Sequence, residues 1–174
     1  HQPQRGTAAD VIGSKVYFAA GYNAPCNEIV YFRPDILELS PEATARDPLG
    51  RKRPLTRADV DAVLHHAFRR KNGELRASAS RFLPGEPLGP YPLEGVRPDD
   101  PNDVIPHEDR RELRAARLLA AWLGHFDLRE QNSLDMWVEE RGQTFVRHYQ
   151  LDFGDGFGSP WTDDRLNRRV GHAH

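Results

Sequence analysis

Two short stretches decide the fold that this chain is expected to adopt: HFDLREQN at residues 125–132 and DFG at residues 152–154. Apolar residues repeat at helical spacing over His107–Leu123, directly before the first stretch, and Gly124 is a natural stop for that helix. Between the two stretches, alternating polar and apolar residues predict a hairpin that turns at Arg141-Gly142. The sequence therefore predicts a helix, a polar loop and a hairpin whose second strand runs into the DFG stretch.

The predicted hairpin, with strands Leu134–Glu139 and Thr144–Phe153, would bring polar side chains from both stretches together. Phosphoryl transfer needs a carboxylate at the attacking hydroxyl group and hard oxygen ligands for magnesium near the phosphates. Asp127 and Asn132 lie five positions apart on one loop, so the first can face an acceptor while the second faces a metal ion. Strand alternation puts one polar set on the same face of the second strand: His148, Gln150 and Asp152. We therefore expect Asp127 to be catalytic and Asn132 and Asp152 to bind the metal ion.

The combined pattern resembles the catalytic loop and metal-binding motif of the protein-kinase-like fold, H-x-D-x-x-x-x-N, a hairpin and D-F-G. The resemblance implies an α+β fold, mainly the helical C-terminal lobe with a catalytic-loop hairpin and a partial N-terminal lobe. It also implies ATP and Mg²⁺ (or Mn²⁺) as cofactors, with His125, Phe153 and Gly154 supporting the site. The divergent middle of the chain is similar to atypical bacterial kinases, such as HipA-type toxin kinases and lipid-kinase relatives.

The resemblance covers residues 7–160 of a chain that we expect to form a single domain, 1–174. It divides the chain into a partial N-terminal lobe with hinge at 7–89, a C-terminal lobe at 90–160 and a tail at 161–174. Asp10 is then the candidate acid that pairs with a phosphate-binding lysine, unless it only caps its helix. Leu83 and Gly85 would lie in a hinge that meets the adenine edge, unless this Pro/Gly segment is a turn without a ligand.

The chain departs from the kinase-like pattern at the phosphate-binding end of the site. There is no Gly-rich loop before the first helix and no strand lysine, since the chain's three lysines lie in a helix or in turns. Arg51 and Arg53 are candidate substitutes, although a solvated basic turn is the favoured interpretation. Without such a cation, Asp127, Asp152 and Asp155 would crowd carboxylates around the same phosphates.

Periodicity also predicts the remaining elements and their buried faces. Helices that open with capping boxes are expected over Thr7–Ala20 and from Thr56 to a stop at Asn72-Gly73. Strands are expected at Glu28–Phe32 and Ala77–Leu83. The positions expected in the core are Ile12, Val16, Ala19 and Ala20; Val60, Val63, Leu64, Ala67 and Phe68; Leu113, Ala116, Ala120 and Leu123; and both Trp122 and Trp137.

Bulk composition excludes several classes of protein. Cys26 is the only cysteine, which excludes an internal disulfide and a Cys-cluster zinc site, and the histidines match no zinc-binding spacing. The net charge of −2 argues against non-specific nucleic-acid binding, which needs a basic surface. No run of about 18 apolar residues and no signal-peptide pattern occurs, so we expect no membrane span and a cytoplasmic location.

The function expected from these features is ATP- and Mg-dependent transfer of phosphate to a hydroxyl group. The expected partners are a nucleotide and a hydroxyl-bearing protein or small molecule. The missing lysine and Gly-rich loop favour a different function, that of a catalytically inactive kinase-fold module which binds nucleotide or protein. A third alternative is a metal-dependent phosphohydrolase that uses the same carboxylates on water.

Overall fold

The computed structural model describes residues 4–47 and 49–158 and has a mixed α+β fold, as the sequence predicts at that coarse level. In chain order the elements are α1 Gln4–Ala19, β1 Asn27–Phe32, β2 Thr44–Arg46, β3 Lys52–Pro54, α2 Arg57–Leu64, β4 Leu75–Ser80, β5 Glu86–Gly89, α3 Arg111–Leu123, β6 Ser133–Glu140 and β7 Gln143–Gln150. Short 3₁₀ turns occur at Pro34–Ile36, His107–Asp109 and Glu130–Asn132. The kinase-like fold itself stays a prediction, and the tail predicted at 161–174 lies outside the described residues.

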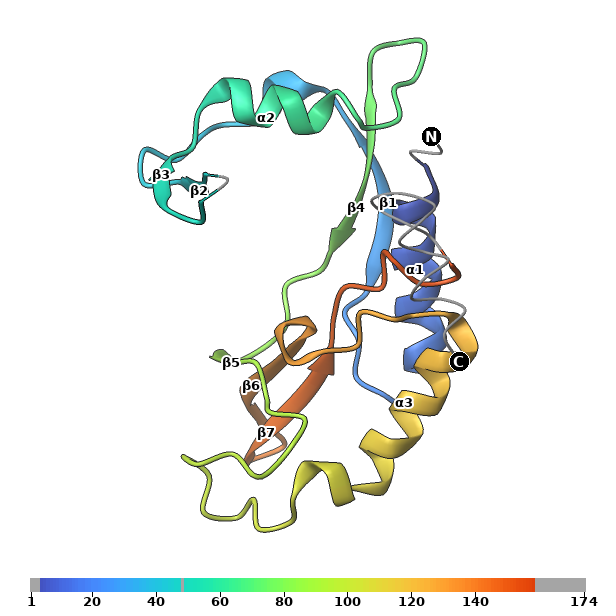
Figure 1. Ribbon diagram of the computed structural model, residues 1–174, viewed down its shortest axis with the longest axis vertical. Helices are drawn as coiled ribbons and strands as arrows, with labels where there is room; N and C mark the ends of the chain where they lie inside the picture. The colour runs from blue at the N-terminus through green and yellow to red at the C-terminus, as the bar shows by residue number, and fades with distance from the viewer. Residues whose placement is uncertain (1–3, 48, 159–174) are drawn as a thin grey trace.

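The elements form two packed groups and an arm (Figure 1). In one group α1 packs on the two-stranded antiparallel sheet of β1 and β4. The other is the three-stranded antiparallel sheet β5-β6-β7. Helix α3 meets α1 at one end, where Leu123 packs in one core cluster with Tyr17 and Phe153. The arm carries α2 and the hairpin β2–β3 away from both groups. Across residues 4–47 and 49–158, no helix has the length and apolar character needed to cross a membrane.

The buried face of α1 differs from the predicted one. Of the expected core positions, Ile12, Ala19 and Ala20 are exposed. The buried residues are instead Ala9, Gly13, Ser14 and Tyr17. Gly13 faces Phe153 so closely that a Cβ atom on Gly13 would lie 2.5 Å from the Cβ atom of Phe153. The periodicity argument failed because it counts apolar side chains, whereas this contact depends on the absence of a side chain.

The two predicted capping boxes have different outcomes. Thr7 lies inside α1, where its hydroxyl donates to the carbonyl oxygen of Gln4 at 3.0 Å, so the first box is wrong. Thr56 and Asp59 form the second box reciprocally, as predicted. Arg53 adds an ion pair to Asp59 at 2.6 Å, which ties the β2–β3 hairpin to the start of α2.

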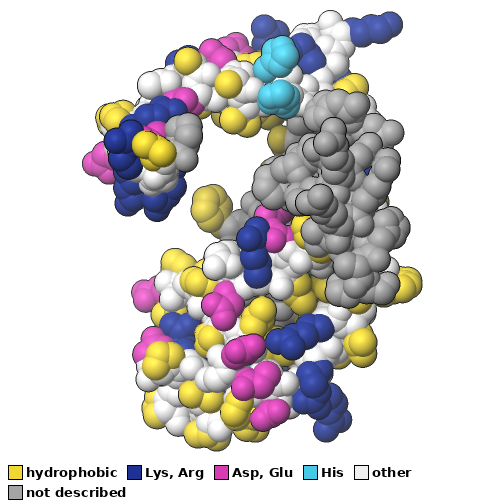
Figure 2. Space-filling view, in the orientation of Figure 1, with side chains coloured by type: hydrophobic (Ala, Val, Ile, Leu, Met, Phe, Trp, Pro, Cys, Tyr) yellow, Lys and Arg dark blue, Asp and Glu magenta, His cyan; other side chains and the backbone are white. Residues whose placement is uncertain are grey.

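The predicted length and burial of the second helix are both wrong. α2 ends at Leu64, and the predicted stop, Asn72-Gly73, lies instead in a tight turn that leads into β4. No residue of α2 is buried, and Val63 is 71% exposed, because the arm carries this helix away from the packed groups. Figure 2 shows Lys and Arg side chains gathered on this arm, over β2 and β3. The arm therefore contributes no core.

The hairpin that the sequence predicts is present. Arg141 and Gly142 both have positive φ (54° and 75°) at the turn between β6 and β7, as a two-residue hairpin loop requires. The hairpin's buried apolar side chains are Met136, Val138 and Tyr149. Strand β5 was not predicted, because its sequence, Glu86–Gly89, lies in a proline-rich segment; it pairs with β6 at the edge of the sheet.

The predicted burial is largely correct for the third helix but wrong for the two tryptophans. α3 buries Ala116, Ala120 and Leu123, as expected, while Leu113 is half-buried. Trp122 is 77% exposed on the outer side of α3, and Trp137 is 44% exposed on β6, so their assignment to the core is wrong. Neither tryptophan lies on the buried face of its own element, and within the described residues both side chains stay exposed.

Candidate functional site

The loop after α3 and the segment after β7 converge on one open cleft of about 430 Å³. Its lining includes all three residues predicted to carry the chemistry, Asp127, Asn132 and Asp152. The other lining residues are Gly6, Arg129, Gly154 and Asp155. The backbone N–H of Leu151 donates to the carbonyl oxygen of Asn132 at 2.8 Å, which joins the loop to the end of the hairpin.

Asn132 is oriented by Asp127. The side-chain amide nitrogen of Asn132 donates to the carbonyl oxygen and to Oδ2 of Asp127, both at 2.9 Å. Because the amide nitrogen is used in this way, the amide oxygen of Asn132 is the atom left to bind a cation. Arg129 also donates to Oδ2 of Asp127, at 2.7 Å, so the Asp127 carboxylate is held from two sides.

Asp152 reaches the cleft by a route that strand alternation did not predict. β7 ends at Gln150, and Asp152 follows with a φ of 54°, in the left-handed region that non-glycine residues rarely occupy. His148 and Gln150 line a different cavity from Asp152, so the shared face predicted for the three residues is wrong. Backbone strain of this kind concentrates at functional sites, since it persists only where the surroundings impose it.

Two buried side chains, His125 and Phe153, adjoin the backbone at Asp152. Nε2 of His125 donates to the carbonyl oxygen of Asp152 at 3.1 Å, and Nδ1 accepts from the hydroxyl of Tyr17 at 3.0 Å. Burial lowers the pKa of His125, so the ring is neutral and can take both roles. Phe153 is 1% exposed and packs on Tyr17 and Leu123. His125 and Phe153 thus both adjoin Asp152, and the supporting role expected of them stays a prediction.

Asp155 is the residue of the cleft whose environment is most unusual. Its carboxylate is 6% exposed, and Oδ1 lies 3.4 Å from Nε2 of His125, the ring nitrogen that also faces the carbonyl oxygen of Asp152. Burial, together with the charges of Asp127 and Asp152, raises the pKa of Asp155 from 3.8 to about 6. Burying a carboxylate beside two others is unfavourable for the fold, and carboxylates with a raised pKa are concentrated at functional sites, so Asp155 is a candidate member of the site. The sequence indicated Asp155 only as one of three carboxylates expected around the phosphates.

Replacing Asp155 with asparagine should stabilise the fold at neutral pH and change little near pH 4. The folded-state pKa is raised, so the unfolded chain releases its proton first as the pH rises. The wild type should therefore lose up to about 2–3 kcal/mol of stability between pH ~4 and pH ~6, a loss that asparagine avoids. Urea unfolding across this range measures the difference, with the exposed Asp109→Asn as the control. A difference independent of pH would contradict the assignment.

A second cavity, of about 640 Å³, adjoins the first, since Gly6, Asp152 and Gly154 line both. Two of the residues assigned to nucleotide binding, Asp10 and Leu83, line this second cavity. Its polar wall also includes Asn27, Ser78, Ser80 and Arg81. The structure thus places Asp10 and Leu83 on a path that leads to Asp152.

Asp10 and Gly85, both predicted to bind nucleotide, have different surroundings in the structure. Oδ1 of Asp10 accepts from the backbone N–H of Phe153 at 3.3 Å, and burial raises the pKa of Asp10. Gly85 does not line either cavity; a Cβ atom there would collide with the carbonyl oxygen of Trp137. The close approach of β6 therefore accounts for glycine at position 85.

The two arginines considered as phosphate-binding cations, Arg51 and Arg53, do not lie at the candidate site. Arg51 pairs with Asp47 at 2.7 Å and Arg53 with Asp59, both on the arm, and neither lines the cavities. The favoured interpretation, a solvated basic turn, agrees with this placement. Arg81 and Arg129 are the basic residues that line the two cavities within the described part of the chain. Sequence reasoning missed Arg81. The only indication in the sequence is that Arg81 lies in the predicted strand Ala77–Leu83, two residues before Leu83.

The donor set fits Mg²⁺ better than a metal held by protein alone. In the ranges 4–47 and 49–158, no group of three His, Cys, Asp or Glu side chains is arranged to hold a metal ion. Mg²⁺ commonly takes one or two protein oxygen ligands and completes its shell with water and substrate phosphates. The amide oxygen of Asn132 and the carboxylate of Asp152 meet that requirement.

Comparison with known proteins adds no family to this description: the chain matches no protein-family model, no curated protein and no solved structure. The kinase-like resemblance therefore rests on the residues of the two motifs and on the geometry of the cleft.

Proposed function

We propose that this chain is an ATP- and Mg²⁺-dependent phosphotransferase of the kinase-like type, which transfers phosphate to a hydroxyl acceptor. The observation that carries the proposal is the convergence of Asp127, Asn132 and Asp152 on one cleft that opens into a second cavity. These residues come from two stretches separated by a hairpin, and their convergence supplies the oxygen ligands and the carboxylate that phosphoryl transfer requires.

Each residue has a distinct role in this proposal. Asp127 orients or deprotonates the acceptor hydroxyl, and Arg129 holds its carboxylate in place. Asn132 and Asp152 hold the metal ion, which when bound offsets phosphate charge. Leu83 gives the apolar wall against which a nucleotide base packs, in the cavity that Arg81 also lines. The guanidinium of Arg81 takes the place of the lysine that the sequence lacks.

Thermal unfolding with ATP tests the metal site. ATP with Mg²⁺ should raise the melting temperature by several degrees at saturation, and ATP in EDTA should not. Asp152→Asn should remove the metal-dependent rise, because it deletes the charged ligand, while the exposed Asp35→Asn should retain it. An equal rise in EDTA, or a full rise with Asp152→Asn, would refute the proposal.

A catalytically inactive nucleotide-binding module is the second candidate. It is favoured by the absence of lysine from the lining of both cavities in the described part of the chain and by the use of Arg129 on Asp127. ATP binding without any release or transfer of phosphate would select this alternative.

A further inference from the structure

A third cavity, of about 470 Å³, lies at the opposite ends of α1 and α3 from the site above. It is formed by residues 20–23 after α1, the start of α3, His148 and Gln150 of β7, and by Tyr91 and His107. Its volume falls in the range that is usual for small-molecule sites. Segments from four distant parts of the sequence therefore enclose a space of ligand size.

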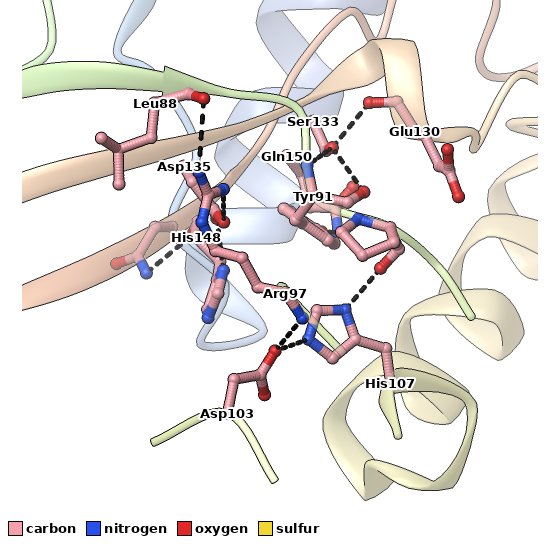
Figure 3. Close-up of polar contacts among 12 residues, drawn as sticks. Leu88, Tyr91, Arg97, Asp103, His107, Glu130, Ser133, Asp135, His148 and Gln150 are labelled. Carbon is pink, nitrogen blue, oxygen red and sulfur yellow. Dashed lines mark hydrogen bonds and ion pairs between the residues drawn. The ribbon is translucent and has the colours of Figure 1, made fainter. Parts of the chain in front are cut away.

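Polar side chains in the wall of this cavity are fixed by residues behind them (Figure 3). Asp135 is fully buried and accepts hydrogen bonds from Arg97, at 2.9 Å, and from Nδ1 of His148. Nε2 of His148 has no partner among the described residues and is left for a ligand. Tyr91 is 2% exposed and its hydroxyl accepts from Gln150, yet no described residue accepts the hydroxyl's own hydrogen. Because burial raises the pKa of Tyr91, the hydroxyl keeps that hydrogen as an unused donor.

His107 is a buried polar side chain of the wall, with a partner at each ring nitrogen. Nδ1 of His107 faces the carbonyl oxygen of Pro92, and Nε2 faces the carboxylate of Asp103 at 2.8 Å. Burial alone would raise the pKa of Asp103, but hydrogen bonds from Arg97 and His107 and the charge of Arg110 bring it below its ordinary value. Asp103 is therefore ionised, and the two contacts fix the ring of His107 in the wall of the cavity.

The basic side chains that line the cavity differ in whether a carboxylate pairs with them. Among the described residues, His107 contacts Asp103 and His148 contacts Asp135, and Glu112 is the acidic residue of the lining. Arg110 is paired with Asp103, whereas Arg111 has no ion pair in the described part of the chain. Arg111 also begins α3, whose first turn has no side-chain cap, and the free N–H groups there add positive potential.

We propose that this cavity binds a small organic anion, a carboxylate or a phosphate monoester, with a flat apolar body. Arg111 and the hydroxyl of Tyr91 donate to the anionic group, and Nε2 of His148 makes a further polar contact. The apolar part of the wall, which includes Ala20, Leu113 and Ala115, packs on the body of the ligand. This cavity is separate from the cleft at Asp152, so the proposal does not depend on the proposed phosphotransferase function.

Titration of the folded chain with benzoate, phenyl phosphate and benzyl alcohol, followed by amide NMR shifts, tests the proposal. At least one of the two anions should shift residues 20–23 and 110–115 with a saturable curve, and which one does so identifies the anionic group. The uncharged benzyl alcohol should not saturate at the same concentrations. Failure of both anions to bind, or equal binding of benzyl alcohol, would overturn the proposal.

Variants separate the proposed contacts from general charge effects. Tyr91→Phe and Arg111→Gln should each weaken the binding anion by about tenfold or more, because each deletes a donor to a charged group. Arg117→Gln, an exposed change on the same helix outside the cavity, should bind as the wild type does. Asp152→Asn should also bind normally. Equal weakening by Arg111→Gln and Arg117→Gln would indicate unspecific attraction and contradict the site.

Discussion

Replacing Asp127 with alanine should lower phosphoryl transfer by about 10²–10⁴, the range for loss of a general acid or base. The carboxylate of Asp127 lies in the cleft with Asp152 and is held by Asn132 and Arg129. Its proposed role is at the acceptor hydroxyl and not at the metal ion. Metal-dependent nucleotide binding should persist, because Asp152 still supplies a charged oxygen ligand. Transfer of labelled phosphate from ATP to the chain itself and to water measures the rate, and thermal shift measures the binding.

Two further variants separate the chemical role of Asp127 from its role as an anchor. Asp127→Asn keeps an oxygen that accepts from Asn132 but removes the basic carboxylate, so it should be nearly as slow as alanine. Arg129→Gln removes a neighbour that is 57% exposed and should affect the rate less. Wild-type turnover in Asp127→Ala would show that this residue serves only the conformation of the loop.

Replacing Phe153 with alanine should destabilise the fold by about 3–5 kcal/mol, the range for a buried phenylalanine. Phe153 is 1% exposed, and its ring centre lies 4.9 Å from that of Tyr17 and 5.7 Å from that of His125. Its Cβ also fills the space left open by Gly13. The loss is a large fraction of the stability of a small domain, so urea unfolding should show a much lower midpoint.

The matched control is Phe18→Ala. Phe18 lies next to Tyr17 on α1 but is 72% exposed, so its removal should change stability by no more than about 0.5 kcal/mol. Equal losses for the two variants would contradict the view that Phe153 is the centre of this core. In Phe153→Ala at a temperature where the chain stays folded, metal-dependent ATP binding should also weaken, since Phe153 follows Asp152 directly.

The sequence by itself determined the elements whose signals are local. Gly124 ends α3 in the left-handed conformation, and Arg141-Gly142 closes the β6–β7 hairpin, because turn chemistry depends on a few adjacent residues. Three of the four positions in the predicted apolar stripe of α3 are also buried, since a strongly periodic stripe has one face to bury. From these elements alone, Asp127 and Asn132 could be placed on one loop between a helix and a hairpin.

Only the tertiary structure decided which faces are buried and where Asp152 points. The buried side of α1 is set by Gly13 against Phe153, two residues 140 positions apart, and helical spacing carries no record of such a partner. Asp152 leaves the strand in a left-handed conformation that the hydrogen bond from His125 to its carbonyl oxygen helps to hold, so alternation could not predict its direction. The buried carboxylate of Asp155 is likewise invisible locally, because burial and electrostatic repulsion depend on everything that packs around a group and not on its neighbours in the chain.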